Sequence, residues 1–179
     1  MSKIGKINIT IPDKVKVLLS GNIINIEGPL GKKSLKIDTE IFDLIINEGK
    51  EVSIKPKKIN QNSKRLWGMN RSLINNAIIG SSKGYEKILE LVGVGFRATL
   101  KGKQLNLQLG FSHDVNFDIP ESIKVTVEKQ TTVKISGHDK QLVWMVVSEI
   151  KTLRPPEPYK GKGIKEKGQY ILRKEGKKK

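Results

Sequence analysis

Residues 21–31 read Gly21-Asn-Ile-Ile-Asn-Ile-Glu-Gly28-Pro-Leu-Gly31, in which apolar and polar side chains alternate between glycines. The same outline returns 81 residues later as Gly102-Lys-Gln-Leu-Asn-Leu-Gln-Leu-Gly110-Phe-Ser112. Alternation with a period of two predicts a strand with one buried face, and the leading glycine predicts a tight hairpin turn. The recurrence therefore predicts that the chain contains two copies of one unit.

The same shift relates a second pair of segments. Val52-Ser-Ile54-Lys corresponds to Val133-Lys-Ile135-Ser, and a helical pattern follows each of them. Chance similarity among short β-rich segments is the alternative explanation for these matches. Duplication explains in addition why a strand leads into a helix in both halves.

Two helices have the clearest patterns. Asn62 or Ser63 is expected to cap the first helix, and Gly80 is expected to end it. Asp139 is expected to cap the second helix, and Pro155 to stop it, because proline lacks the amide hydrogen that a helix needs. The buried stripes predicted from the helical period are Leu66, Met69, Leu73, Ile74, Ala77 and Ile78 in the first helix, and Leu142, Val143, Val146, Val147, Ile150 and Leu153 in the second.

Short alternating segments elsewhere predict strands. The expected ranges are 6–11, 15–19, 23–27, 88–100, 104–109, 123–128 and 132–136. One helix covers only one face of a sheet, so each unit is predicted to be a small, mainly antiparallel sheet with one helix packed on one face. The predicted class is therefore α+β with two duplicated domains, residues 1–81 and 82–153. A basic C-terminal extension, residues 154–179, is expected to follow and to add little to either core.

The charge of the chain is strongly basic and unevenly distributed. The 179 residues carry 34 Lys and Arg against 18 Asp and Glu, a net charge of +16. Residues 151–179 contain eleven of these basic side chains and three of the acidic ones, so half of the excess lies in this segment. Such a surplus favours a polyanion as the partner. A tail that only increases solubility is the alternative.

Few residues could support catalysis or bind a metal. The chain has no cysteine, and its two histidines, His113 and His138, are well separated. Ser112-His113-Asp114 cannot form a catalytic relay, because neighbouring side chains of a strand point to opposite faces. Gly93-Val-Gly95-Phe-Arg-Ala98 has the glycine spacing of a dinucleotide site, but another alternating segment follows where that site needs a helix. We therefore expect no enzyme, no metal site, no cofactor and no small-molecule substrate.

Composition also bears on the cellular setting. No apolar run approaches the roughly 20 residues that a membrane span needs, and the first residues show no leader pattern, so no membrane partner is expected. Lysine (29) greatly exceeds arginine (5), and isoleucine (23) greatly exceeds alanine (2). An A/T-rich genome would produce this bias. It favours an organelle-encoded gene or a bacterium of low G+C content.

Residues 153–165, Leu-Arg-Pro-Pro-Glu-Pro-Tyr-Lys-Gly-Lys-Gly-Ile-Lys, carry the functional signal. Their three prolines are expected to hold the chain extended after the second helix. Tyr159 offers a flat ring for stacking on a base or sugar, and Gly161 and Gly163 are expected to let backbone amides approach phosphate. The point charges around them are Lys160, Lys162 and Lys165. A proline-rich docking motif for a protein partner is the alternative.

Several motifs resemble one family over essentially the whole chain. The stretch from Pro155 to Ile164 resembles the C-terminal signature of the bacterial-type ribosomal protein six family of the large subunit, and residues 2–6, 90–98, 105–113 and 139–143 are also similar to it. The resemblance implies two duplicated α+β domains bound to large-subunit (23S-type) rRNA, near the factor-binding region and the sarcin–ricin loop. It also implies neighbouring large-subunit proteins as partners. In that family the second domain and the C-terminal segment make the principal RNA contacts.

The resemblance, together with the chemistry of the segment, assigns RNA contacts to individual positions. They are Lys140, Arg154, Tyr159, Lys160, Gly161, Lys162, Gly163, Lys165, Lys167, Arg173 and Lys174. The chain departs from the family at Trp144, where a glycine is usual, and at residues 165–167, where Lys-Glu-Lys replaces a basic–aromatic pair.

The predicted function is a structural constituent of the large ribosomal subunit that supports translation. Its predicted location is the ribosome of a bacterial cytoplasm, or of a mitochondrion or plastid. A free-standing RNA-binding regulator or RNA chaperone is the alternative.

Overall fold

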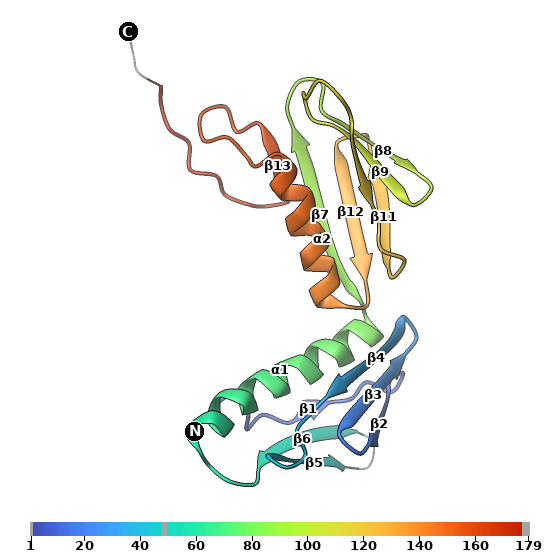
Figure 1. The fold of residues 1–179 in the computed structure, drawn as a ribbon, viewed down its shortest axis with the longest axis vertical. Helices are drawn as coiled ribbons and strands as arrows, with labels where there is room; N and C mark the ends of the chain where they lie inside the picture. The colour runs from blue at the N-terminus through green and yellow to red at the C-terminus, as the bar shows by residue number, and fades with distance from the viewer. Residues whose placement is uncertain (1, 48–49, 177–179) are drawn as a thin grey trace. The chain divides into compact units, whose positions relative to one another are not determined.

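The computed structural model describes residues 2–47 and 50–176, so residues 177–179 of the predicted extension lie outside the described part. Contacts within the chain divide it into two compact units, which Figure 1 draws as ribbons. Unit 1 contains the residues up to 84 together with 138–140, and unit 2 contains residues 85–137 and those from 141 onward. Each unit has its own hydrophobic core.

Unit 1 places one helix against two small antiparallel sheets. Its elements are β1 (Ile9–Thr10), β2 (Lys16–Ser20), β3 (Ile23–Gly28), β4 (Gly31–Lys36), β5 (Phe42–Asn47), β6 (Glu51–Pro56) and α1 (Gln61–Ser82). The strand orders are β2-β3-β4 and β1-β6-β5. α1 packs against β3, β4 and β6, and the inward side chains of these strands, such as Ile26 and Ile54, form the core with the helix.

Unit 2 has the same order of elements and one strand more. Its elements are β7 (Tyr85–Val92), β8 (Arg97–Lys101), β9 (Gln104–Gln108), β10 (Val115–Asp118), β11 (Ile123–Glu128), β12 (Thr132–Gly137), α2 (Lys140–Leu153) and β13 (Gly163–Glu166). The strand orders are β10-β9-β8 and β11-β12-β7-β13. Leu89, Leu107, Val133 and Ile150 are fully buried in the core that these sheets share with α2.

The sheet topology confirms the duplication. β3 and β9, which the 81-residue shift relates, are each the middle strand of a three-stranded sheet. Each follows a hairpin turn at a glycine of positive φ, Gly21 (58°) and Gly102 (62°). β6 and β12 also correspond, because each lies between the first and the fifth strand of its unit and leads into the helix. The predicted α+β class is confirmed, and the structure adds that the strands of each unit form two sheets.

The strand prediction was incomplete. β4, β5, β10 and β13 lie outside all predicted ranges, and β6 was indicated only through the repeated segment that starts at Val52. The predicted strand 88–100 is wrong as a single element, because a turn with Gly95 at φ 80° separates β7 from β8. In that turn the Phe96 amide donates to the Gly93 carbonyl at 3.3 Å. The glycine motif at residues 93–98 is therefore followed by a strand, β8, whereas a dinucleotide site would need a helix there.

The buried face of α1 differs from the prediction. Trp67 and Asn70 are buried, whereas Met69 and Leu73, which were predicted to lie in the core, are 49% and 42% exposed. The indole Nε1 of Trp67 donates a hydrogen bond to the Ile54 carbonyl at 2.7 Å, and this contact fixes the rotation of the helix over β6. Hydrophobicity alone gave no sign that a polar asparagine would lie inside and a methionine outside.

The ends of α1 differ slightly from the predicted ones. The helix is capped at Asn60, whose amide donates to the Ser63 hydroxyl at 2.8 Å. It continues through the buried Gly80 to Ser82. The helix is terminated by Gly84, which has a φ of 76° and whose amide donates to carbonyls of the last helical turn.

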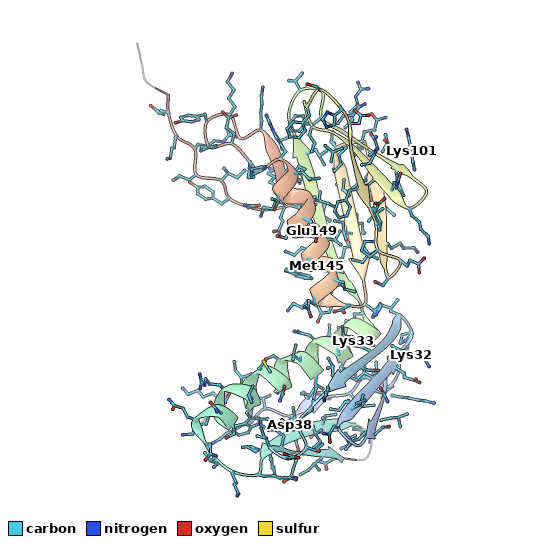
Figure 2. All side chains as sticks on the ribbon, viewed as in Figure 1. Lys32, Lys33, Asp38, Lys101, Met145 and Glu149 are labelled. Carbon is cyan, nitrogen blue, oxygen red and sulfur yellow. The ribbon has the colours of Figure 1, made fainter. Side chains whose placement is uncertain are left out.

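α2 agrees with its predicted pattern. Val143, Val146, Val147 and Ile150 are buried, and Leu142 and Leu153 pack against the same core. Met145 and Glu149, labelled in Figure 2, lie on the solvent side of the helix. Within the described residues, no helix is long and apolar enough to cross a membrane.

The segment after α2 contributes to the core of unit 2, contrary to expectation. β13 pairs antiparallel with β7, and its Ile164, opposite Leu91, is fully buried. The expectation that residues 154–179 add little core is therefore wrong for this strand. The sequence signal was weak, because one isoleucine between glycine and lysine shows no alternation.

We expect Ile164→Ala to destabilise unit 2 by about 2–5 kcal/mol, the usual range for truncating a buried isoleucine to alanine. The measurement is urea denaturation followed by circular dichroism. Leu172→Ala is the matched control, because Leu172 lies in the same predicted extension but is 63% exposed. Equal stabilities for the two variants would contradict the assignment of β13 to the core.

Candidate nucleic-acid interface

Residues 154–163 form a closed loop and not the extended strand that the prolines suggested. The Glu157 amide donates to the Lys162 carbonyl at 2.8 Å, and the Gly161 amide donates to the Glu157 carbonyl at 3.0 Å. The loop is closed where the Ile164 amide donates to the Arg154 carbonyl at 2.9 Å. The chain thus leaves α2, turns at residues 158–160 and returns into β13. We call residues 154–163 the C-terminal loop.

Gly161 and Gly163 are required by the shape of this loop. Both have positive φ, 68° and 139°, which L side chains rarely adopt. A Cβ at Gly163 would lie 2.6 Å from the Pro155 carbonyl oxygen, and a Cβ at Gly161 would lie 2.8 Å from the Arg173 guanidinium. The Gly161 amide donates to the Glu157 carbonyl inside the loop, and the predicted approach of backbone amides to phosphate stays a prediction.

The loop gathers several of the predicted cations. Arg154, Lys160 and Lys162 are exposed on it, and Arg173 lies against Gly161. The Lys174 amide donates to the Pro158 carbonyl at 3.0 Å, which fixes this later segment beside the loop. None of these five cations forms an ion pair with a carboxylate of residues 2–47 or 50–176.

Tyr159 lies at the turn of the loop, between Pro158 and Lys160. Its side chain is 54% exposed. An exposed ring next to cations that have no carboxylate partner is suited to stacking on a base or sugar. The exposure of Tyr159 is therefore compatible with its predicted role in stacking on RNA.

Three other predicted contacts lie elsewhere. Lys165 is on β13, where its ammonium pairs with Glu90 of β7 at 3.1 Å. Lys140 starts α2, belongs to unit 1, and donates to the Asn76 side-chain oxygen at 3.4 Å. Lys167 is exposed just after β13, and its amide donates to the Ile88 carbonyl. The structure thus does not bring these residues into the C-terminal loop.

Glu166 ties β13 to both neighbouring elements. Its carboxylate accepts from Lys87 on β7 at 2.6 Å and from Lys151 on α2 at 3.3 Å. The hydrogen bond from Lys87 is the main reason why the pKa of Glu166 lies below its ordinary value; burial opposes this shift. At residues 165–167, where this chain departs from the family, Lys165 and Glu166 therefore form ion pairs that hold β13 in place.

Sequence reasoning missed the apolar neighbours of the loop. Val94, Phe96, Leu109 and Gly110 join Arg154, Pro155, Glu157 and Lys162 in lining a pocket of about 320 Å³. Val94 is 92% exposed, and the Arg154 guanidinium lies 5.2 Å from the centre of the Phe111 ring. The turns after β7 and β9 thus share one surface with the loop. Their glycines were visible in the sequence, but only the fold places them beside it.

The described residues contain no group of three or more side chains that could hold a metal ion. The surface built by the C-terminal loop consists of exposed cations, an exposed aromatic ring and a small apolar pocket. Cations of this kind neutralise phosphates, and flat rings stack on bases. This combination is suited to RNA.

Known proteins are similar to the chain over its full length. It is 46% identical to the large ribosomal subunit protein uL6 of Novosphingobium aromaticivorans and 47% identical to that of Methylocella silvestris, in each case over 179 residues that cover 100% of both chains. The chain belongs to the ribosomal protein L6 family. The family model, Ribosomal protein L6, matches residues 92–167, which include the C-terminal loop and β13. The resemblance drawn from the sequence motifs is confirmed.

The structure explains how this member of the L6 family accommodates Trp144. The indole packs edge-on against Tyr85, with ring centres 5.7 Å apart, and the Lys87 ammonium lies 5.0 Å above its centre. Trp144 remains 38% exposed, so the large ring lies at the edge of the core and displaces none of it. Burial also raises the pKa of the Tyr85 hydroxyl.

Glu166→Gln should lower the free energy of unfolding by about 0.5–1 kcal/mol at neutral pH. The reason is that Lys87 and Lys151 lose the negative charge with which they form partly exposed ion pairs. Since the folded-state pKa of Glu166 is lowered, its stabilisation is present above its ordinary value of 4.5 and is lost as pH falls through the folded-state pKa. Urea denaturation of both proteins across this range measures the difference. Glu121→Gln, which breaks the exposed pair with Lys103, should change stability less. A Glu166→Gln deficit that persists in acid would contradict the ion-pair explanation.

Proposed function

We propose that the protein is a structural constituent of the large ribosomal subunit that binds large-subunit rRNA through the C-terminal loop and supports translation. The observation that carries the proposal is the set of exposed cations around a hydrogen-bonded loop in unit 2. Full-length similarity to proteins named large ribosomal subunit protein uL6 supports the ribosomal assignment. We place the contact near the factor-binding region and the sarcin–ricin loop, as the family resemblance implies.

The loop would bind RNA with little loss of conformational entropy. Its backbone is already held by internal hydrogen bonds and anchored at both ends, by α2 and by β13. Lys160 and Lys162 are free to neutralise phosphates, and Arg154 and Arg173 can bind phosphate with two hydrogen bonds. Preorganisation of this kind increases affinity, because the ordering has occurred before binding.

The partners of the protein follow from this role. They are large-subunit rRNA and neighbouring large-subunit proteins, on the ribosome. No catalytic role, cofactor or small-molecule substrate is proposed. The similarity to bacterial proteins supports a bacterial-type ribosome, that of a bacterium or of an organelle.

A sedimentation experiment separates this function from its alternative, a free-standing RNA-binding regulator or chaperone. The tagged protein should sediment with large subunits through a sucrose gradient in high salt, since an integral constituent is held by many contacts. Release at moderate salt, with the protein recovered at the top of the gradient, would favour the regulator.

The cations and the tyrosine of the loop should have separable effects on binding to a 23S-type rRNA fragment that contains the sarcin–ricin region. Lys160→Ala and Lys162→Ala should each lower the slope of log affinity against log salt by about 0.7–0.9, because each loses one phosphate contact. Tyr159→Ala should leave the slope unchanged and cost about 1–3 kcal/mol of binding free energy if the ring stacks. Binding isotherms across a salt series measure both quantities.

Lys103→Ala is the matched control, because Lys103 is an exposed lysine of unit 2 that is paired with Glu121. It should change neither the slope nor the affinity appreciably. Unchanged slopes for both Lys160→Ala and Lys162→Ala would show that the loop does not bind phosphate.

A further inference from the structure

The first described residues of unit 1 form a segment held flat along α1. Gly5 lies directly on the indole of Trp67, so closely that a Cβ there would be 2.6 Å from the ring. The Gly5 amide donates to the Ser2 hydroxyl at 3.2 Å, and Arg71 Nε donates to the Ile7 carbonyl at 3.3 Å. This segment, residues 2–8, is thus held against the helix, and the side chains of residues 3, 4 and 6–8 are exposed.

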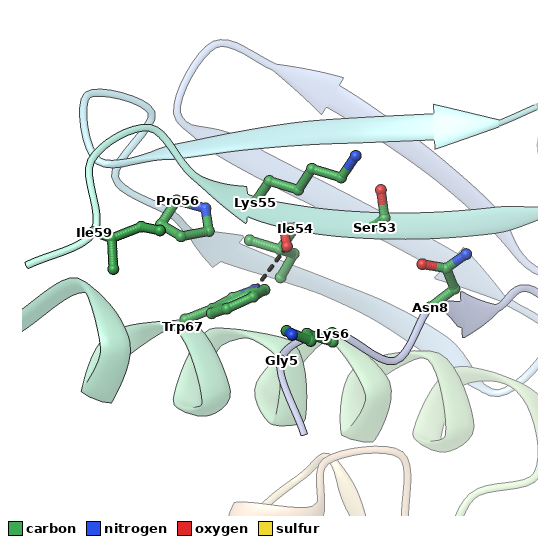
Figure 3. A pocket seen from close by; sticks show the side chains of 9 residues that line it. All are labelled: Gly5, Lys6, Asn8, Ser53, Ile54, Lys55, Pro56, Ile59 and Trp67. Carbon is green, nitrogen blue, oxygen red and sulfur yellow. Dashed lines mark hydrogen bonds between the residues drawn. The ribbon is translucent and has the colours of Figure 1, made fainter. Parts of the chain in front are cut away.

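A pocket of about 380 Å³ opens between this segment, β6 and the start of α1 (Figure 3). Trp67, Ile54, Pro56 and Ile59 provide its apolar lining, and Ile59 is 59% exposed at its edge. This volume lies at the small end of the roughly 300–1,000 Å³ that is typical of ligand pockets. Its lining includes no carboxylate.

Cations predominate around this pocket. Lys6 and Lys55 line it and are exposed. Five more basic residues are close in sequence to lining residues, namely Lys3, Lys57, Lys58, Lys64 and Arg65. Of the seven, Lys57 alone pairs with a carboxylate of the described chain, that of Asp43 at 3.5 Å. The carboxylate of Glu51, on β6, accepts a hydrogen bond from the lining residue Asn8 at 3.0 Å.

We propose that unit 1 carries a second RNA-binding surface, in which this pocket takes an unpaired base and the surrounding lysines neutralise the phosphates on either side of it. An apolar pocket with a cationic border is suited to an unstacked base, which would lie beside the buried indole of Trp67. A double helix would contact the lysines but could not enter the pocket. The surface is independent of the C-terminal loop, because all its residues belong to unit 1.

The full chain allows a direct optical test. It contains two tryptophans, so Trp144→Phe leaves Trp67 as its only tryptophan and keeps an aromatic ring beside Tyr85. A mixed-sequence single-stranded RNA hexamer should then change Trp67 fluorescence in a saturable manner. A blunt-ended RNA duplex, in which every base is paired, should bind without this change.

Charge variants in the Trp144→Phe background test the phosphate contacts. Lys6→Ala with Lys55→Ala should lower the salt slope of the fluorescence titration by about 1.4, at about 0.7 per phosphate contact of a single strand. Lys16→Ala with Lys36→Ala, on β2 and β4, is the matched control with the same loss of charge and should leave the titration unchanged. Thermal unfolding of each variant shows that unit 1 remains folded.

Three outcomes would overturn the proposal. They are no response of Trp67 to single-stranded RNA, an equal response to the blunt-ended RNA duplex, and a response to polyglutamate in place of RNA, which would indicate an acidic protein partner. If binding to the 23S-type rRNA fragment is still weakened by Lys160→Ala and Lys162→Ala, the function proposed for unit 2 remains supported. The two proposals therefore fail separately.

Discussion

The pairing of β13 with β7 is the constraint on which the C-terminal surface depends. It buries Ile164 in the core of unit 2 and brings Glu166 between Lys87 and Lys151. Because one end of the C-terminal loop is α2 and the other is this strand, the loop cannot remain extended. Its cations are consequently fixed on the surface of a folded unit, whereas a tail would carry them on a mobile chain.

The duplicated units differ at this strand. Unit 1 ends with its helix, whereas unit 2 continues from its helix through the loop into an additional edge strand. The common part of both units supplies most of each core, and the addition supplies Ile164 and the loop that we assign to rRNA. The added segment of unit 2 therefore gives the two related units different surfaces, and it adds Ile164 to a core that otherwise corresponds to that of unit 1.

Ion pairing decides which of the many lysines can bind a polyanion. Lys87, Lys151 and Lys165 lie near the loop in sequence or in space, yet each pairs with a carboxylate of unit 2. Lys160 and Lys162 have no such partner in the described chain. Net charge is thus a poor guide to single residues, although it indicated the class of partner correctly.

The sequence by itself determined the duplication, the α+β class, the buried stripe of α2 and the family, because these follow from period, spacing and motifs along the chain. It did not determine the rotation of α1, where Trp67 and Asn70 replace Met69 and Leu73 inside, nor the strand at Ile164. It also could not show that Lys165 is paired or that Val94 and Phe96 lie beside Arg154. These features depend on contacts between residues far apart in sequence, and only the tertiary structure brings such residues together.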